Sequence, residues 1–192
     1  MASAARKLLT IEDWISLPDS EKCELIEGDF VYKSMPSFEH GQFQGNLRES
    51  LSKFNRKNDG GNNPPFTGWW FATEVAVAYE GRSNGFIHDI AGWRRDKHKE
   101  KPKGKKVIIK PDWVCEILSG NKSNDLITKK WVLHEHRVEY YWIVDLEEEI
   151  VQVFRWSEEG YTNISDAKKG EKKKLEPFEA IEMDIAFLFG YD

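Results

Sequence analysis

Residues 111–119 have the sequence PDWVCEILS, and they limit the possible folds more than any other stretch of the chain. Their centre, WVCEIL, is apolar on both alternating faces except at Glu116. A strand that is apolar on both faces is buried on both faces, as in the middle of a sheet that helices cover on each side. The stretch therefore predicts a central strand, with one acid where an apolar side chain is expected.

The neighbouring segments predict further strands and helices around this central strand. Turn residues and the spacing of apolar side chains indicate the order α–β–β–α–β–β–β–α–β–β, followed by short elements. The predicted helices cover residues 10–17, 37–56 and 123–136. Thr10 and Ser37 are the expected N-terminal caps of the first and second of these helices. The predicted strands cover residues 23–26, 30–35, 69–79, 86–93, 112–119, 138–145 and 150–156. This order indicates an α/β (α+β) domain with a mixed central β-sheet flanked by helices.

The length and composition predict one domain over residues 1–192, with residues 150–192 as a β-rich C-terminal extension of it. A chain of 192 residues has the usual size of a single domain, and its 40% of hydrophobic residues excludes a disordered protein. No apolar run reaches membrane-spanning length, and the start of the chain lacks the apolar core of a signal peptide. We therefore expect a cytoplasmic protein with no membrane partner.

The cysteines and tryptophans indicate a reduced, aromatic-rich core. Cys23 and Cys115 each lie in a strand-like run without a CxxC partner, so we expect two buried thiols rather than a disulfide. The chain has 8 tryptophans, which recur inside apolar runs. For Trp113, Trp131 and Trp142 we expect packing in the core rather than stacking on nucleic-acid bases.

The charge of the chain is unevenly distributed. The net charge is −5 at pH 7, but residues 94–106, RRDKHKEKPKGKK, hold eight Lys or Arg and two acids. We interpret this segment as a basic mobile loop, which is either solvated without further function or a phosphate-binding rim. In the second interpretation the side chains that contact nucleic acid are Lys97, Lys99, Lys101, Lys103, Lys105 and Lys106.

Three acids lie in runs that otherwise predict buried strands: Glu24 in CELI, Asp89 in FIHDIAGW and Glu116 in WVCEIL. Burying an ionised carboxylate without a partner is costly, so each acid needs a cation, a metal ion or a raised pKa. A single buried acid usually belongs to a salt bridge, whereas three acids on strands with a lysine nearby indicate a shared cation site. The pattern alone leaves both interpretations open.

A shared cation site of this kind suits phosphodiester hydrolysis. Mg²⁺ takes oxygen ligands and keeps several waters, so two carboxylates and a backbone carbonyl leave places for a phosphate oxygen and an attacking water. The ion polarises the phosphate and lowers the pKa of the water, and a lysine can orient that water or stabilise the charge of the transition state.

Six segments occur in an order and at a spacing that match a known family. They are ELIEGDFV, SFEHGQFQGNL, FIHDIAGW, KPDWVCEILS, NDLITKKWVL and VEYYWIVD. In them the chain resembles the Uma family of "putative restriction endonucleases", which belongs to the PD-(D/E)XK nuclease superfamily. The resemblance covers about residues 9–155, and its most specific part is CEILS followed by DLxxK and EYYWIVD.

The resemblance implies a restriction-endonuclease-like fold and four catalytic residues. Asp89 and Glu116 would bind the metal, Mg²⁺ or Mn²⁺, with Glu24 as a supporting acid. Leu118 stands where much of the superfamily has its lysine, and the resemblance instead implies Lys129 on the following helix. Supporting roles are open for four residues: His40, which matches the family's E-H pair, Ser119, Asp125, and Lys130 as the alternative to Lys129.

Two departures from the family concern the shape of the loops more than the chemistry. His88 stands where the family has proline before the first metal acid, and Arg137 and Glu139 stand in a loop that usually carries Gly and Pro. Because the four catalytic residues are retained, we predict a metal-dependent endonuclease acting on DNA, and the resemblance is compatible with a homodimer. Two alternatives stay open: a catalytically silent nuclease-like module that binds nucleic acid or protein, and a metal-dependent hydrolase of another phosphate ester.

Overall fold

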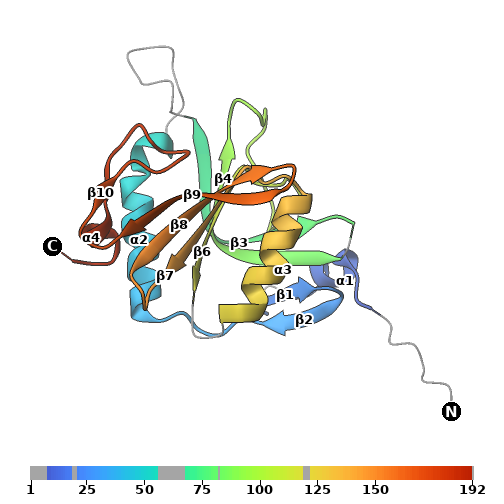
Figure 1. The fold of residues 1–192 in the computed structure, drawn as a ribbon. Helices are drawn as coiled ribbons and strands as arrows, with labels where there is room; N and C mark the ends of the chain where they lie inside the picture. Colours follow the sequence, from blue (N-terminus) through green and yellow to red (C-terminus); the bar gives the residue numbers. More distant parts are fainter. Residues whose placement is uncertain (1–7, 19–20, 56–67, 82, 119–121, 192) are drawn as a thin grey trace.

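The computed structural model describes residues 8–18, 21–55, 68–81, 83–118 and 122–191, and for residues 122–125 it describes the backbone alone. In this part of the chain nine strands form one mixed sheet, and two short strands pair separately (Figure 1). The strands of the sheet are β1 (Cys23–Ile26), β2 (Asp29–Tyr32), β3 (Trp69–Tyr79), β4 (Asn84–Arg94), β5 (Lys106–Val107), β6 (Trp113–Leu118), β7 (Tyr140–Asp145), β8 (Ile150–Ser157) and β9 (Gly160–Lys168). The separate pair is β10 (Lys172–Lys173) with β11 (Met183–Asp184).

The order of the strands places β6 inside the sheet. The main path of neighbours is β2-β1-β4-β6-β7-β8-β9, while β3 pairs with β4 and β5 pairs with β3. The pairs β6–β7 and β3–β5 are parallel, and the other pairs of this sheet are antiparallel. The central position predicted from residues 111–119 is confirmed, as is the mixed sheet.

Helices cover both faces of the sheet (Figure 1). On one face α2 (Phe38–Ser50) packs Phe43 and Leu47 into a core that also contains Trp142 of β7. On the other face α3 (Lys122–Glu135) packs against Tyr141, the preceding residue of β7. The remaining helices are α1 (Ile11–Ile15), the 3-10 helix η1 (Ser52–Asn55) and α4 (Ile185–Leu188). None of the helices described has the length and apolar composition needed to cross a membrane.

Local sequence signals explain where the first two helices begin. The side chain of Thr10 accepts a hydrogen bond from the backbone N–H of Asp13, and that of Ser37 accepts one from His40, so both predicted caps are confirmed. The helix predicted over residues 37–56 is shorter than expected, because the regular α-helix ends at Ser50 and η1 follows it.

The core contains most of the residues expected there. Cys23 and Cys115 are buried free thiols, and the side chains of Trp113 and Trp142 are fully buried. The expectation for Trp131 was wrong, because its side chain is 37% exposed. Apolar residues follow it in the sequence, but Trp131 lies two residues after the buried Lys129, which puts it on the opposite side of α3.

The strands β1 and β6 lie along the same edge of β4. Leu25 of β1 pairs with Gly85 near the start of β4, and β6 pairs further along it. Between these contacts, side chains bond the backbone of Ile87: its N–H donates to Glu24 at 2.9 Å, and its carbonyl oxygen accepts from Lys33 at 2.8 Å. The gap between β1 and β6 along this edge of β4 therefore leaves room for polar side chains beside Ile87, just before Asp89 in the sequence.

The pairing between β3 and β4 is interrupted opposite Asp89. The residues on either side of Glu74 pair in regular register, but Glu74 itself has a left-handed backbone with φ 47°. Such a backbone is uncommon for a residue other than glycine, and strained positions of this kind gather at functional sites. The carbonyl oxygen of Asp89 accepts a hydrogen bond from the side chain of Gln44 in α2, at 2.6 Å.

Candidate active site

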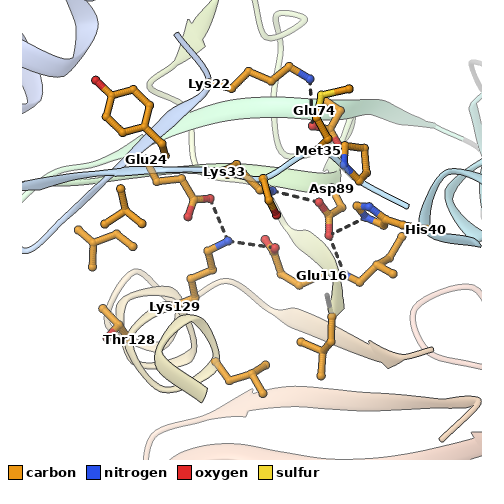
Figure 2. A pocket seen from close by; sticks show the side chains of 18 of the residues that line it. Lys22, Glu24, Lys33, Met35, His40, Glu74, Asp89, Glu116, Thr128 and Lys129 are labelled. Atoms are coloured by element: carbon orange, nitrogen blue, oxygen red, sulfur yellow. Dashed lines mark hydrogen bonds and ion pairs between the residues drawn. The ribbon is translucent and has the colours of Figure 1, made fainter. Parts of the chain in front are cut away.

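A pocket of about 710 Å³ opens beside the split between β1 and β6. Acidic and basic side chains from many of the surrounding elements converge on it (Figure 2). They include Glu24 of β1, Lys33 after β2, His40 of α2, Glu74 of β3, Asp89 of β4, Glu116 of β6 and Lys129 of α3. The volume is within the usual range for a small-molecule or substrate site.

Lys129 lies between two of these acids. Its Nζ is 2.9 Å from Oε1 of Glu24 and 3.1 Å from Oε2 of Glu116, and its side chain is 3% exposed. Burial alone would lower the pKa of Lys129, but the charges of Glu116 and Glu24 outweigh burial and raise it well above its ordinary value. Burial would raise the pKa of Glu116, but Lys129 and His88 together lower it to about 2. Lys129 and Glu116 are therefore both charged at neutral pH.

Asp89 is neutralised less completely than Glu116. Its Oδ1 accepts a hydrogen bond from Nζ of Lys33 at 3.1 Å, and its Oδ2 accepts one from the backbone N–H of Ile117 at 2.7 Å. Burial and the neighbouring charge of Glu116 nevertheless raise the pKa of Asp89, against the opposing effect of Lys33. Additional positive charge beside Asp89 would therefore stabilise its ionised form.

His88 holds the second oxygen of Glu116. Its Nδ1 lies 2.5 Å from Oε1 of Glu116, and its Nε2 lies 2.7 Å from the hydroxyl of Tyr79. Burial raises the pKa of Tyr79 well above its ordinary value, so the phenol keeps its proton and can donate it to Nε2. Nδ1 of a neutral imidazole then carries the proton that is donated to Glu116. His88 thus fixes the orientation of Glu116 from the position directly before Asp89.

This chain of hydrogen bonds predicts different effects for two buried tyrosines. Tyr79→Phe is expected to destabilise the protein by about 1–3 kcal/mol, because it leaves Nε2 of His88 without its donor. Tyr141 is equally buried, but its hydroxyl has no hydrogen-bond partner among the described residues. Tyr141→Phe is therefore expected to leave the free energy of unfolding unchanged or to increase it. Urea unfolding of both variants at neutral pH makes the comparison, and equal losses would contradict the role given to His88.

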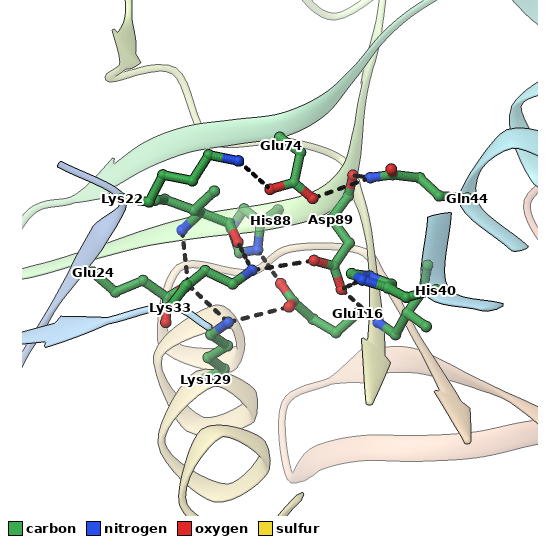
Figure 3. Close-up of polar contacts among 12 residues, drawn as sticks. Lys22, Glu24, Lys33, His40, Gln44, Glu74, His88, Asp89, Glu116 and Lys129 are labelled. Carbon is green, nitrogen blue, oxygen red and sulfur yellow. Dashed lines mark hydrogen bonds and ion pairs between the residues drawn. The ribbon is translucent and has the colours of Figure 1, made fainter. Parts of the chain in front are cut away.

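A second group of side chains lies on the other side of Asp89 (Figure 3). Nε2 of His40 is 3.3 Å from Oδ2 of Asp89, and neither ring nitrogen of His40 has a hydrogen-bond partner in the described structure. The carboxylate of Glu74 accepts a hydrogen bond from Gln44 at 3.3 Å and lies 3.9 Å from Nζ of Lys22. One ligand atom from each of His40, Glu74 and Asp89 lies within 4.8 Å of the other two.

The structure brings Glu24, Asp89, Glu116 and Lys129 to one pocket, with His40 beside them. Lys130, the alternative to Lys129, points elsewhere, since its Nζ lies 3.8 Å from the centre of the Phe154 ring. The other two sequence candidates, Ser119 and the side chain of Asp125, lie outside the described residues.

The basic segment 94–106 supplies none of the side chains that line this pocket. Lys97 pairs with Asp112 at 3.3 Å and with Glu139 at 2.5 Å. These acids directly precede β6 and β7, so Lys97 lies at the start of the central strands, whereas Glu116 lies near the end of β6. Of the remaining lysines, Lys99, Lys101, Lys103 and Lys105 are exposed, and Lys106 donates to the backbone carbonyl of Trp14.

Sequence reasoning missed Glu74 and Lys33. Glu74 lies in the apolar run WWFATEVAVAY, so it carried the same signal, an acid inside a strand, that singled out Glu24. Lys33 carried no such signal, because a lysine at the end of a hairpin strand is normally exposed. It reaches Asp89 only because β1 and β6 separate along β4.

A mixed sheet covered by α2 and α3, with acids on β1, β4 and β6 facing a lysine of α3, defines a restriction-endonuclease-like fold. The chain belongs to the Uma2 family, whose model is described as "Putative restriction endonuclease" and matches residues 9–186. The family resemblance seen in the sequence is thereby confirmed. The three acids and Lys129 lie within the matched range.

One solved structure supports the same fold. The chain is similar to "a putative nuclease belonging to DUF820 from Anabaena variabilis", with a TM-score of 0.68 and 23% sequence identity. The similarity covers 94% of this chain and 97% of the Anabaena chain. A search of curated proteins found no match.

Proposed function

We propose that this chain is a divalent-metal-dependent endonuclease that hydrolyses phosphodiester bonds in DNA. The observation that carries the proposal is the pair Asp89 and Glu116, which lie on neighbouring strands and line the same pocket. The raised pKa of Asp89 supports a place for further positive charge in that pocket. Carboxylate oxygens are the donors that Mg²⁺ and Mn²⁺ prefer, so the residues present fit such an ion.

Asp89 and Glu116 would hold the metal ion, and Glu24 would support the site by keeping Lys129 in place. The ion would polarise the scissile phosphate and lower the pKa of a bound water. Lys129 carries its proton firmly, because its pKa is raised well above the ordinary value, so it does not suit the role of a general base. Its ammonium group is instead suited to orient the attacking water or to stabilise negative charge on the phosphate.

A second candidate function is a nuclease-like module that binds nucleic acid without cutting it. The observation that favours it is the pairing of Asp89 with Lys33 and of Glu116 with Lys129, since the two acids then have cations of their own. The raised pKa of Asp89 favours the first function, because Lys33 does not fully offset the burial of that acid.

Nicking of supercoiled plasmid DNA distinguishes the two functions. The proposed endonuclease nicks the plasmid with Mg²⁺ or Mn²⁺ and stops when EDTA is added. DNA binding that persists without cleavage in any metal would support the silent module. Parallel reactions with RNA and with bis(p-nitrophenyl) phosphate test whether another phosphate ester is the substrate.

The exposed lysines of segment 94–106 give a prediction about DNA binding. If this segment contacts the DNA backbone, changing Lys99, Lys101 and Lys103 to Gln removes up to three counterion-releasing contacts. The slope of log K against log salt concentration should then become shallower by up to about 2.7. The measurement is fluorescence anisotropy of a labelled duplex over a salt series, and an unchanged slope would assign the segment to ordinary solvated surface.

A further inference from the structure

His40 is a buried polar side chain whose ring nitrogens are not hydrogen-bonded. Its side chain is 7% exposed, and neither Nδ1 nor Nε2 has a hydrogen-bond partner in the described residues. Nε2 lies 3.3 Å from Oδ2 of Asp89 without the geometry of a hydrogen bond, whereas buried polar atoms normally have hydrogen-bond partners, so this imidazole needs an explanation. The ring points into the pocket toward Asp89 (Figures 2 and 3), and its backbone position is fixed because the Ser37 side chain caps α2 at the His40 N–H.

Glu74 also lies close to Asp89 and is held in place there. The left-handed backbone at Glu74 interrupts the pairing of β3 with β4 opposite Asp89. Gln44 then links the two acids, because its Nε2 donates both to the carboxylate of Glu74, at 3.3 Å, and to the backbone carbonyl of Asp89, at 2.6 Å. A strained backbone that places a carboxylate near an orphaned imidazole is difficult to explain by packing alone.

We propose that His40, Glu74 and Asp89 form a second cation site, distinct from the pair Asp89 and Glu116. Ligand atoms of the three residues lie within 4.8 Å of one another, which is close enough for one ion to contact all three. The carboxylate of Asp89 lies between Glu116 and His40, so it belongs to both sites (Figure 3). The inference rests on the proposed function only through this shared acid.

The chemistry of the ligands indicates which cation the second site takes. Mg²⁺ and Ca²⁺ prefer oxygen ligands alone, whereas an imidazole ligand favours first-row transition metals, Zn²⁺ strongly and Mn²⁺ more weakly. One imidazole nitrogen and two carboxylate oxygens therefore favour Mn²⁺ or Zn²⁺ over Mg²⁺. The pair Asp89 and Glu116 has only oxygen donors, so Mg²⁺ should compete well with Mn²⁺ there and poorly at His40.

Titration with Mn²⁺, followed by electron paramagnetic resonance of the free ion, tests the proposal on the purified full chain. The wild type is expected to bind two Mn²⁺ ions, of which excess Mg²⁺ displaces one. His40→Ala and Glu74→Gly should each weaken the Mg²⁺-resistant ion by at least about 10-fold. Glu116→Gln should weaken the other ion, and Asp89→Asn should weaken both.

Glu74→Gly keeps the test independent of folding. Glycine adopts a left-handed backbone without strain, so this variant loses the carboxylate but is expected to be at least as stable as the wild type. The proposal is overturned if His40→Ala and Glu74→Gly both bind Mn²⁺ as the wild type does. Binding at the His40 site without DNA cleavage in any metal would remove the proposed endonuclease and leave the second cation site standing.

Discussion

Asp89→Asn is expected to abolish metal-dependent cleavage of DNA and to change the stability of the protein little. The amide keeps the size of the side chain but removes the anionic charge that the proposed metal ion needs. Loss of such a preorganised electrostatic group typically slows an enzyme by about 10²- to 10³-fold. Stability should change little, because two effects oppose each other. The raised pKa means that the folded state disfavours the ionised carboxylate, but the amide oxygen can accept only one of the two hydrogen bonds that Lys33 and Ile117 donate to Asp89.

The measurement combines plasmid nicking in Mg²⁺ and Mn²⁺ with urea unfolding of the same preparations. Glu158→Gln is a suitable control, because it removes the same unit of charge from an exposed acid that lies in the β8–β9 turn and does not line the pocket. Nicking by Asp89→Asn at the wild-type rate would show that this acid is not part of the catalytic site, and with it the metal proposal would fail.

Glu116→Gln is expected to affect stability differently from Asp89→Asn. The pKa of Glu116 is lowered to about 2, so its ionised form stabilises the fold above the ordinary pKa of about 4.5, and that stabilisation is lost as the pH falls through about 2. Neutralising Glu116 is therefore expected to reduce both cleavage and stability at pH 7. The contrast with Asp89 follows from the balance of burial and charge, because Lys129 and His88 outweigh the burial of Glu116, whereas burial and the charge of Glu116 outweigh the effect of Lys33 on Asp89.

The acids of the site were predictable from the sequence because burial is a local signal. Glu24, Asp89 and Glu116 each interrupt an apolar strand, and the cost of burying a charge applies wherever the strand lies. The position of Lys129 came from the family resemblance, and the helical periodicity of α3 explains why Lys129 faces the sheet while Trp131 does not. Neither inference required knowledge of the order of the strands.

Other parts of the site depend on tertiary structure and left little local trace. Lys33 enters the pocket because β1 and β6 diverge along one edge of β4, which no pattern in residues 23–35 encodes. His88 looked in sequence like a departure that affects loop shape, but it lies within β4 and bonds Glu116. The charge of residues 94–106 predicted exposed lysines, but charge density does not determine which end of the sheet they occupy.

Lys129→Met is expected to destabilise the fold by about 3–5 kcal/mol at pH 7, because it leaves Glu24 and Glu116 buried without their shared cation. It should also slow cleavage by about 10²-fold or more, since the ammonium group is the proposed stabiliser of charge at the phosphate. Lys130→Met is the matched control: it removes the same group one residue away, where the interaction lost is with the Phe154 ring, worth at most about 1 kcal/mol.

The pH dependence of Lys129→Met distinguishes a lost ion pair from a simple packing defect. With Lys129 present, Glu116 is held ionised down to a pKa of about 2. Without it, burial dominates and raises the pKa of this carboxyl, so the unfavourable charge disappears as the acid takes up a proton. The loss of stability relative to the wild type should therefore be largest at neutral pH and shrink as the pH falls toward about 4.5. Urea unfolding at pH 7 and pH 5 measures this trend, and an equal loss at both values would mean that Lys129 acts through its methylene chain rather than through its charge.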